Sequence, residues 1–281
     1  MCELFGMSSR LPTTVNRSIA EFARHGGLSG PHSDGWGIAF FDGTDVRLFK
    51  EPEPAAESSW IPFVQERSIE SSVVISHLRR ATRGPRALRN TQPFCREMGG
   101  RKHVFAHNGF FVGVDDLDLG TFRPVGDTDS EVAFCHLLAR LQLLQHYSDR
   151  TPGPMDVLAV VESVAERLAA MGPANFLYSD GQTMYAHSDR RRGADGTIAP
   201  PGLHILTREC ALEGDGEKQS VVLIASQPLS DERWRPVPEG TILVVSEGLV
   251  LGSAMRRSRG AARARPTDSS VTAGESSQTV H

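Results

Sequence analysis

Short apolar segments recur over the first 252 residues, and most have the length of a β-strand. They are rich in Val, Ile and Phe and are separated by Gly, Pro, Asp or Ser, a pattern typical of antiparallel strands joined by hairpins. The ten segments are GIAFF (37–41), DVRLFK (45–50), SVVISH (72–77), HVFAH (103–107), NFLYS (175–179), TMYAH (183–187), LHILT (203–207), SVVLIAS (220–226), TILVVS (241–246) and GLVLG (248–252).

Three longer segments have the spacing of helices. Residues 14–27 end in a glycine pair suited to a C-cap, and residues 155–172 carry an apolar face. Residues 128–146 open with Thr128 and Glu131 in the T-x-x-E order of a capping box. The pattern therefore predicts three helices that lie in separate blocks between the strands.

Hairpin strands with helices in separate blocks argue against a doubly wound parallel sheet and favour antiparallel sheets covered by helices. We expect an α+β protein with one domain over residues 1–252. From Ser253 onward the chain is mostly Arg, Ser, Ala, Gly and Thr, with almost nothing apolar to bury. This composition predicts a disordered tail over residues 253–281.

Composition excludes several classes of function. The 281 residues carry a net charge of −4, which provides no basic footprint for nucleic acid or anionic lipid. The longest apolar runs fall far short of the ~20 residues of a membrane helix, and the chain does not begin like a signal peptide. The four cysteines occur singly, without metal-finger spacing. We expect a cytoplasmic protein that binds no metal, cofactor, nucleic acid or membrane.

The first candidate for chemistry is Cys2, which directly follows the initiator methionine. A residue at this position is usually part of a frayed terminus. If Met1 is removed, however, Cys2 carries a free α-amine with a pKa of about 7.7–8.0 beside a thiol with a pKa of about 8.5. That amine can accept the thiol proton, so that one residue supplies both nucleophile and base.

The segment AHNGF (106–110) has two interpretations. Asn-Gly after a strand is typical of a type I′ hairpin turn. The side-chain amide of Asn108 and the backbone N–H of Gly109 could also converge on one point, and two such donors stabilise a tetrahedral oxyanion.

Charged residues after a strand and before a helix indicate a substrate with two charges. Arg79, Arg80 and Arg83 lie with Thr82 in SHLRRATRG (76–84). These arginines either lie on the surface in contact with water or bind a carboxylate of the substrate. Asp129 is either a residue favoured at a helix start or an acceptor for an α-ammonium group. One cation and one anion together would fit an amino acid.

Six motifs in this order resemble the glutaminase domain of class II glutamine amidotransferases, and most closely its small stand-alone YafJ-like branch. They are MCELFGMSS, GPHSDGWGIAFF, SHLRRATRG, NTQPF, AHNGF and RPVGDTDSE, and the resemblance covers roughly residues 1–251. It implies the four-layer αββα sandwich of N-terminal nucleophile hydrolases, with two mostly antiparallel sheets between helical layers.

The resemblance also implies roles for residues. Cys2 would attack the side-chain amide of glutamine, and Asn108 and Gly109 would stabilise the oxyanion. Arg79 would bind the α-carboxylate, Asp129 the α-ammonium, and Thr82 would line the same pocket. A loop behind the nucleophile in this branch is matched by Asp34, Gly35, Trp36 and Gly37, which could equally form a turn entering a strand. His32 stands where many family members carry an arginine-glycine pair.

Arg80 and Arg83 depart from the tryptophan and histidine that many family members carry at these positions, and they leave the leaving group open. Three functions follow as hypotheses. The first is a glutaminase that supplies ammonia to a separate synthase, since no nucleotide-binding motif provides an acceptor site here. The second is a stand-alone γ-glutamyl amide or peptide hydrolase, resembling the amidohydrolase of ergothioneine synthesis. The third is a non-catalytic binding module. The sequence is compatible with a homo-oligomer.

Overall fold

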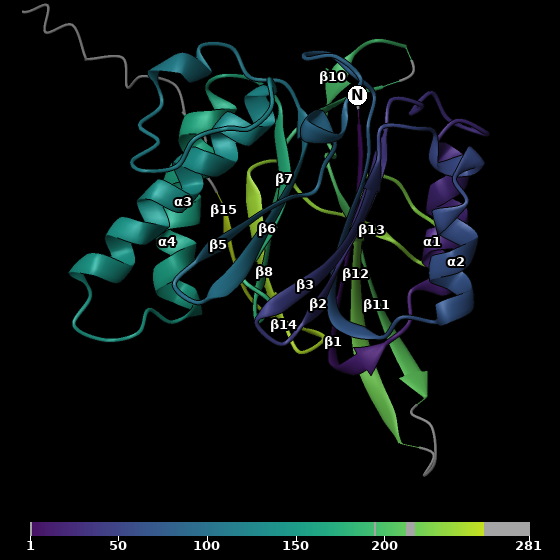
Figure 1. Ribbon diagram of the computed structural model, residues 1–281. Coiled ribbons are helices and arrows are strands. Elements are labelled where there is room, and N and C mark those ends of the chain that lie inside the picture. The colour runs from purple at the N-terminus through teal and green to yellow at the C-terminus, as the bar shows by residue number, and fades with distance from the viewer. Residues whose placement is uncertain (1, 194, 212–216, 256–281) are drawn as a thin grey trace, which may run out of the picture.

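The computed structural model describes residues 2–193, 195–211 and 217–255. Within them, two large antiparallel sheets lie face to face (Figure 1). The first sheet has seven strands, in the spatial order β13 (Arg235–Pro236), β11 (His204–Ala211), β12 (Lys218–Ala225), β1 (Glu3–Thr13), β4 (Ser71–Leu78), β2 (Trp36–Asp42) and β3 (Asp45–Glu51). The second has six: β15 (Leu249–Met255), β14 (Thr241–Ser246), β8 (Met184–Ser188), β7 (Ala174–Ser179), β6 (Arg101–Gly109) and β5 (Phe94–Met98).

Helices cover the outer faces of both sheets, as Figure 1 shows. Helices α1 (Asn16–His25) and α2 (Trp60–Arg67) lie on the first sheet, and α3 (Asp129–Tyr147) and α4 (Pro154–Ala169) on the second. Three short 3₁₀ helices occupy Ala55–Glu57, Leu88–Asn90 and Val114–Asp116. The short strands β9 (Arg191–Arg192) and β10 (Ile198–Ala199) pair with each other as a separate two-stranded ribbon. The expected αββα sandwich is therefore confirmed.

The central strands read as continuous apolar runs because both of their faces are buried. In β1, Leu4 points into the core between the sheets, whereas Phe5 packs toward α1. In β6, Val104 faces the core between the sheets and Phe105 stacks on Phe134 of α3. Successive side chains of a strand thus serve two different cores, which removes the polar alternation of a sheet with one wet face.

All ten expected strands and all three expected helices occur, most of them with shifted ends. The sequence reasoning missed β1, β5 and α2, as well as the short β9, β10 and β13. The expected boundary at residue 253 was wrong, because β15 pairs with β14 through Met255. The rest of the predicted tail, residues 256–281, lies outside the described residues.

Asn108 and Gly109 do not form a hairpin turn. They are the last two residues of β6 and pair with Asn175 and Ala174 of β7, so the type I′ interpretation was wrong. The capping box of α3 is half formed: the Thr128 side chain accepts a hydrogen bond from the Glu131 N–H at 3.3 Å. The Glu131 carboxylate instead accepts from the Gly126 N–H and pairs with Arg96.

Candidate active site

Cys2 directly precedes β1, a central strand of the first sheet that pairs with both β4 and β12. Its sulfur lies 3.4 Å from the backbone nitrogen of Arg80, which donates to it, and 3.5 Å from the Arg80 carbonyl oxygen. Burial raises the pKa of the Cys2 thiol, while the Arg80 N–H and the charge of Arg79 act to lower it. The thiol is thus held against the turn after β4 and needs a base to become a thiolate.

The loop that contains Asp34 fixes this turn. The Asp34 carboxylate accepts a hydrogen bond from the Ala81 N–H at 2.8 Å, and the Asp34 N–H donates to the Arg79 carbonyl at 3.0 Å. Gly35 has a φ of +140°, and its carbonyl accepts from the Arg79 N–H at 2.7 Å. Trp36 begins β2 and is 1% exposed. The DGWG segment is both a turn entering a strand and the support of the chain behind Cys2.

Arg79 is buried at the end of β4. Its guanidinium donates to the carbonyl oxygens of Arg83 at 3.1 Å and Gly84 at 3.0 Å, and of Asp34 at 3.4 Å. Thr82 is exposed in the same loop and is not among the residues that line the cavity beside Cys2. The loop therefore orients Arg79 through backbone carbonyls.

Asp129 is the first residue of α3 and is 4% exposed. Its carboxylate accepts a hydrogen bond from the Phe111 N–H at 2.6 Å, which ties the helix start to the chain that follows β6. The Asp129 charge acts to raise the pKa of the Cys2 thiol, and the Arg79 charge acts to lower it. The structure thus brings both predicted charged residues within electrostatic reach of Cys2.

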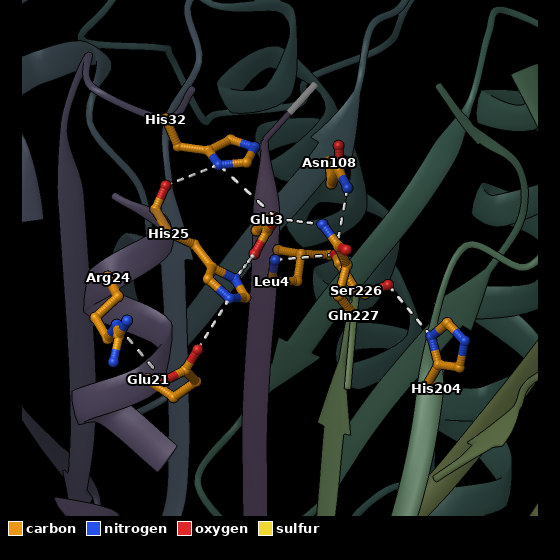
Figure 2. A network of polar contacts seen from close by, with 10 residues as sticks. All are labelled: Glu3, Leu4, Glu21, Arg24, His25, His32, Asn108, His204, Ser226 and Gln227. Atoms are coloured by element: carbon orange, nitrogen blue, oxygen red, sulfur yellow. Dashed lines mark hydrogen bonds and ion pairs between the residues drawn. The ribbon is translucent and has the colours of Figure 1, made fainter. Parts of the chain in front are cut away.

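Asn108, at the end of β6, is 1% exposed and lines the same cavity as Cys2. Its Nδ2 lies 3.3 Å from Ser226 Oγ, and its Oδ1 has no hydrogen-bond partner in the described part of the chain. Figure 2 shows the nitrogen directed at Ser226 and the oxygen directed away. Gly109 follows, where an added Cβ would lie 1.8 Å from the Pro173 carbonyl oxygen, so only glycine fits.

A buried polar network borders Cys2 (Figure 2). Glu3, 2% exposed, accepts a hydrogen bond from His25 Nδ1 at 2.7 Å and another from Gln227 Nε2 at 2.6 Å. His32 Nδ1 donates to the His25 carbonyl at 3.1 Å and lies 3.8 Å from the Glu3 carboxylate. Sequence reasoning found His32 but missed Glu3, His25 and Gln227, because the partners are far apart along the chain.

The cavity beside Cys2 has a volume of about 190 Å³, and its lining includes Asn108, His32, Glu3 and Gln227 together with Arg80 and two arginines of β9. A larger cavity of about 690 Å³ lies between α3 and α4 and is lined by charged residues such as Asp118, Arg140 and Glu166. Only the smaller cavity contains the predicted nucleophile.

The described residues contain no group of three or more His, Cys, Asp or Glu side chains that could hold a metal ion. In the same part of the chain, no helix is long and apolar enough to cross a membrane.

Comparison with known proteins places the chain in a family. The family model for class II glutamine amidotransferases matches residues 1–269. YafJ of Escherichia coli (strain K12) is 42% identical over 247 residues, which is 85% of this chain and 95% of YafJ. The uncharacterized protein MJ1515 of Methanocaldococcus jannaschii is 31% identical over 273 residues, covering 91% of this chain and 72% of that protein.

Solved structures agree with this assignment. The crystal structure of a predicted glutamine amidotransferase from Pseudomonas aeruginosa PA01 has a TM-score of 0.64 and 30% identity, covering 89% of this chain and all of that one. The glutamine phosphoribosylpyrophosphate amidotransferase of Bacillus subtilis has a TM-score of 0.60 at 19% identity, covering 90% of this chain and 49% of that one, and supports the fold. The protein described here belongs to the class II glutamine amidotransferase family.

Proposed function

We propose that the protein hydrolyses the side-chain amide of glutamine, or of a related γ-glutamyl compound, through a thioester on Cys2. The observation that carries the proposal is the position of the Cys2 sulfur. The sulfur accepts a hydrogen bond from the Arg80 N–H and lies beside the cavity that Asn108 also lines. The charges of Arg79 and Asp129 both act on its pKa. A nucleophile, an oxyanion donor and one residue for each charge of an amino acid thus come together.

The reaction begins once Met1 has been removed. The freed α-amine of Cys2 accepts the thiol proton, and the sulfur attacks the γ-carbonyl carbon. The base is needed because burial raises the pKa of the thiol, and the Arg80 N–H supports the thiolate. The C–N bond then breaks, the nitrogen leaves with a proton as ammonia or an amine, and water cleaves the thioester to glutamate.

Asn108 and Gly109 stabilise the oxyanion, with Ser226 setting the direction of the Asn108 amide. Ser226 Oγ already accepts a hydrogen bond from the Leu4 N–H at 3.0 Å, so its hydroxyl hydrogen is free for a further acceptor. The oxygen and nitrogen of a side-chain amide are assigned from their hydrogen-bond partners. If the Asn108 amide is rotated by half a turn, its Oδ1 faces Ser226 and accepts a hydrogen bond from the Ser226 hydroxyl, so that the oxygen is no longer without a partner. The NH₂ group then points away from Ser226, toward the cavity.

The γ-glutamyl group is held by its two charges. The backbone carbonyls that accept from Arg79 hold the guanidinium in place and leave N–H groups for an α-carboxylate. Asp129 uses one oxygen for the Phe111 N–H and has the other for an α-ammonium. Thr82 completes this side of the site.

The test is to incubate the purified chain with glutamine and a panel of γ-glutamyl amides and to follow glutamate and free amine. Release of both by the parent, and by neither Cys2→Ala nor Cys2→Ser, is the expected result. Equal yields without an added acceptor indicate hydrolysis rather than dependence on a synthase. Binding without any turnover would contradict the proposal and favour the binding-module hypothesis.

A further inference from the structure

The cavity beside Cys2 is rich in unpaired positive charge. Arg80, Arg191 and Arg192 all line it, and among the described residues none of the three guanidinium groups forms an ion pair or a hydrogen bond. Arg190, next to them in the chain, is different, because it pairs with Glu239 at 3.5 Å. Two of the three arginines come from β9, which pairs with β10, and Figure 1 shows the β10 label beside the N-terminal end of the chain.

Within the described part of the chain, Glu3 is the carboxylate that lines this cavity, and it forms no ion pair with these arginines. Its two oxygens instead accept hydrogen bonds from His25 and Gln227. Arg191 is partly buried, and burial lowers its pKa while the charge of Glu3 acts to raise it. An unpaired guanidinium that is partly withdrawn from water is stabilised when an anion binds to it.

The cavity also lies apart from the residues proposed to hold the γ-glutamyl group. Cys2 and Asn108 line it, whereas Arg79, Thr82 and Asp129 do not. The γ-carbonyl carbon must meet the Cys2 sulfur, and its glutamyl chain must run toward Arg79 and Asp129. The group on the amide nitrogen must then point the other way, toward the three arginines.

We propose that Arg80, Arg191 and Arg192 form an anion subsite for the leaving group. The favoured substrate is then a γ-glutamyl amide whose amine carries a carboxylate or a phosphate-like group, rather than free glutamine. Guanidinium groups bind such anions through paired, charge-assisted hydrogen bonds. The inference rests on the proposed function and adds the chemical class of its substrate.

In this reaction Cys2 Sγ bonds to the γ-carbon and the amide C–N bond breaks. The nitrogen takes the proton that the thiol had passed to the α-amine and leaves as an anionic amine, and water then releases glutamate from the thioester. No oxidant, reductant or further reactant is required.

The test compares four substrates on the full chain: γ-glutamylglycine, γ-glutamyl-aminomethylphosphonate, the uncharged γ-glutamylglycinamide, and glutamine. The parent should have a higher kcat/KM for the anionic amides than for γ-glutamylglycinamide. The variant Arg191→Gln/Arg192→Gln should lower this ratio by about 10- to 150-fold, the range expected for one charge-assisted hydrogen bond. A higher kcat/KM for γ-glutamylglycine indicates a subsite for a carboxylate, and a higher kcat/KM for γ-glutamyl-aminomethylphosphonate indicates a subsite for a phosphate-like group.

The matched control is Arg10→Gln/Arg17→Gln, which removes two exposed arginines outside the cavity and should keep the parent's ratio. A parent without preference for anionic leaving groups, or a double variant that keeps the preference, overturns the subsite. If the parent hydrolyses no amide at all, the proposed function fails separately. Calorimetry with Cys2→Ala then decides the subsite: tighter binding of γ-glutamylglycine than of γ-glutamylglycinamide supports it, and equal binding refutes it.

Discussion

The sulfur of Cys2 is surrounded by influences that oppose one another. Burial and the Asp129 charge act to raise the pKa of the thiol, whereas the Arg80 N–H and the Arg79 charge act to lower it. Burial is the largest of these influences, so the pKa is raised. Burial therefore leaves the thiol protonated at neutral pH, and the proposed mechanism assigns its deprotonation to the α-amine.

The variant Asn108→Ala tests the oxyanion donor. It should lower kcat about 10²-fold or more and change KM little, because the donor acts on charge that is present only in the transition state. Steady-state kinetics on glutamine measure this. Asn16→Ala, which removes an amide at the start of α1, is the control. A near-normal kcat in Asn108→Ala would show that Asn108 does not stabilise the oxyanion and serves only as part of strand β6.

The variant Asp129→Asn tests recognition of the α-ammonium group. It keeps an oxygen that can accept from the Phe111 N–H and removes only the charge. We expect kcat/KM for glutamine to fall about 10- to 150-fold, corresponding to roughly 1.5–3 kcal/mol. Desamino-glutamine should be a poor substrate for the parent and no worse for the variant. Equal discrimination by both proteins would show that Asp129 only starts the helix.

At the scale of elements, β1 begins directly after Cys2, and it is among the strands that the sequence pattern did not predict. Its first seven residues are buried, yet Gly6, Ser8 and Ser9 interrupt the apolar pattern. Helix α2 was missed because it is short and carries Pro62, which is tolerated in a first turn. The candidates Cys2, Arg79, Asn108 and Asp129 could be found from local motifs. Ser226 and Gln227 could not, because the pairing of β12 with β1 brings them to Cys2. Arg191 could not either, because it is far from Cys2 along the chain and only the fold places it in the same cavity.

The contact between β1 and α1 predicts how stability changes with pH. His25 has a raised pKa, chiefly through its hydrogen bond to Glu3, so its contribution is complete below about pH 6.5 and is lost as pH rises through the raised value. Glu3 has a lowered pKa because, despite burial, His25 and His32 favour its charged form. Its contribution is complete above about pH 4.5 and is lost as pH falls through the lowered value.

Thermal or denaturant unfolding of the parent and of His25→Gln checks this. The parent should be the more stable at pH 6, and its advantage should shrink by on the order of 1 kcal/mol by pH 9. The variant Glu21→Gln should weaken the effect by a smaller amount, since Glu21 also acts to raise the pKa of His25 and faces its other ring nitrogen at 3.6 Å on a more exposed surface. An advantage that is the same at both pH values would contradict the ion pair.

At the scale of the whole molecule, two sheets buried between helical layers place Cys2 at the end of a central strand. An extension before Cys2 removes the free α-amine without touching the core. We therefore expect a chain with a retained N-terminal tag to have the parent's stability and no amidase activity. Activity should return after a protease exposes Cys2. Full activity with the tag in place would contradict the proposed base.

The most direct measurement is mass spectrometry of the N-terminal peptide from protein quenched with acid during turnover of glutamine. We predict a peptide that begins at Cys2, lacks Met1 and carries one γ-glutamyl group as a thioester. The same peptide from Asn108→Ala should accumulate less of it. A γ-glutamyl group on Cys95, Cys135 or Cys210, or an active preparation that retains Met1, would contradict the account.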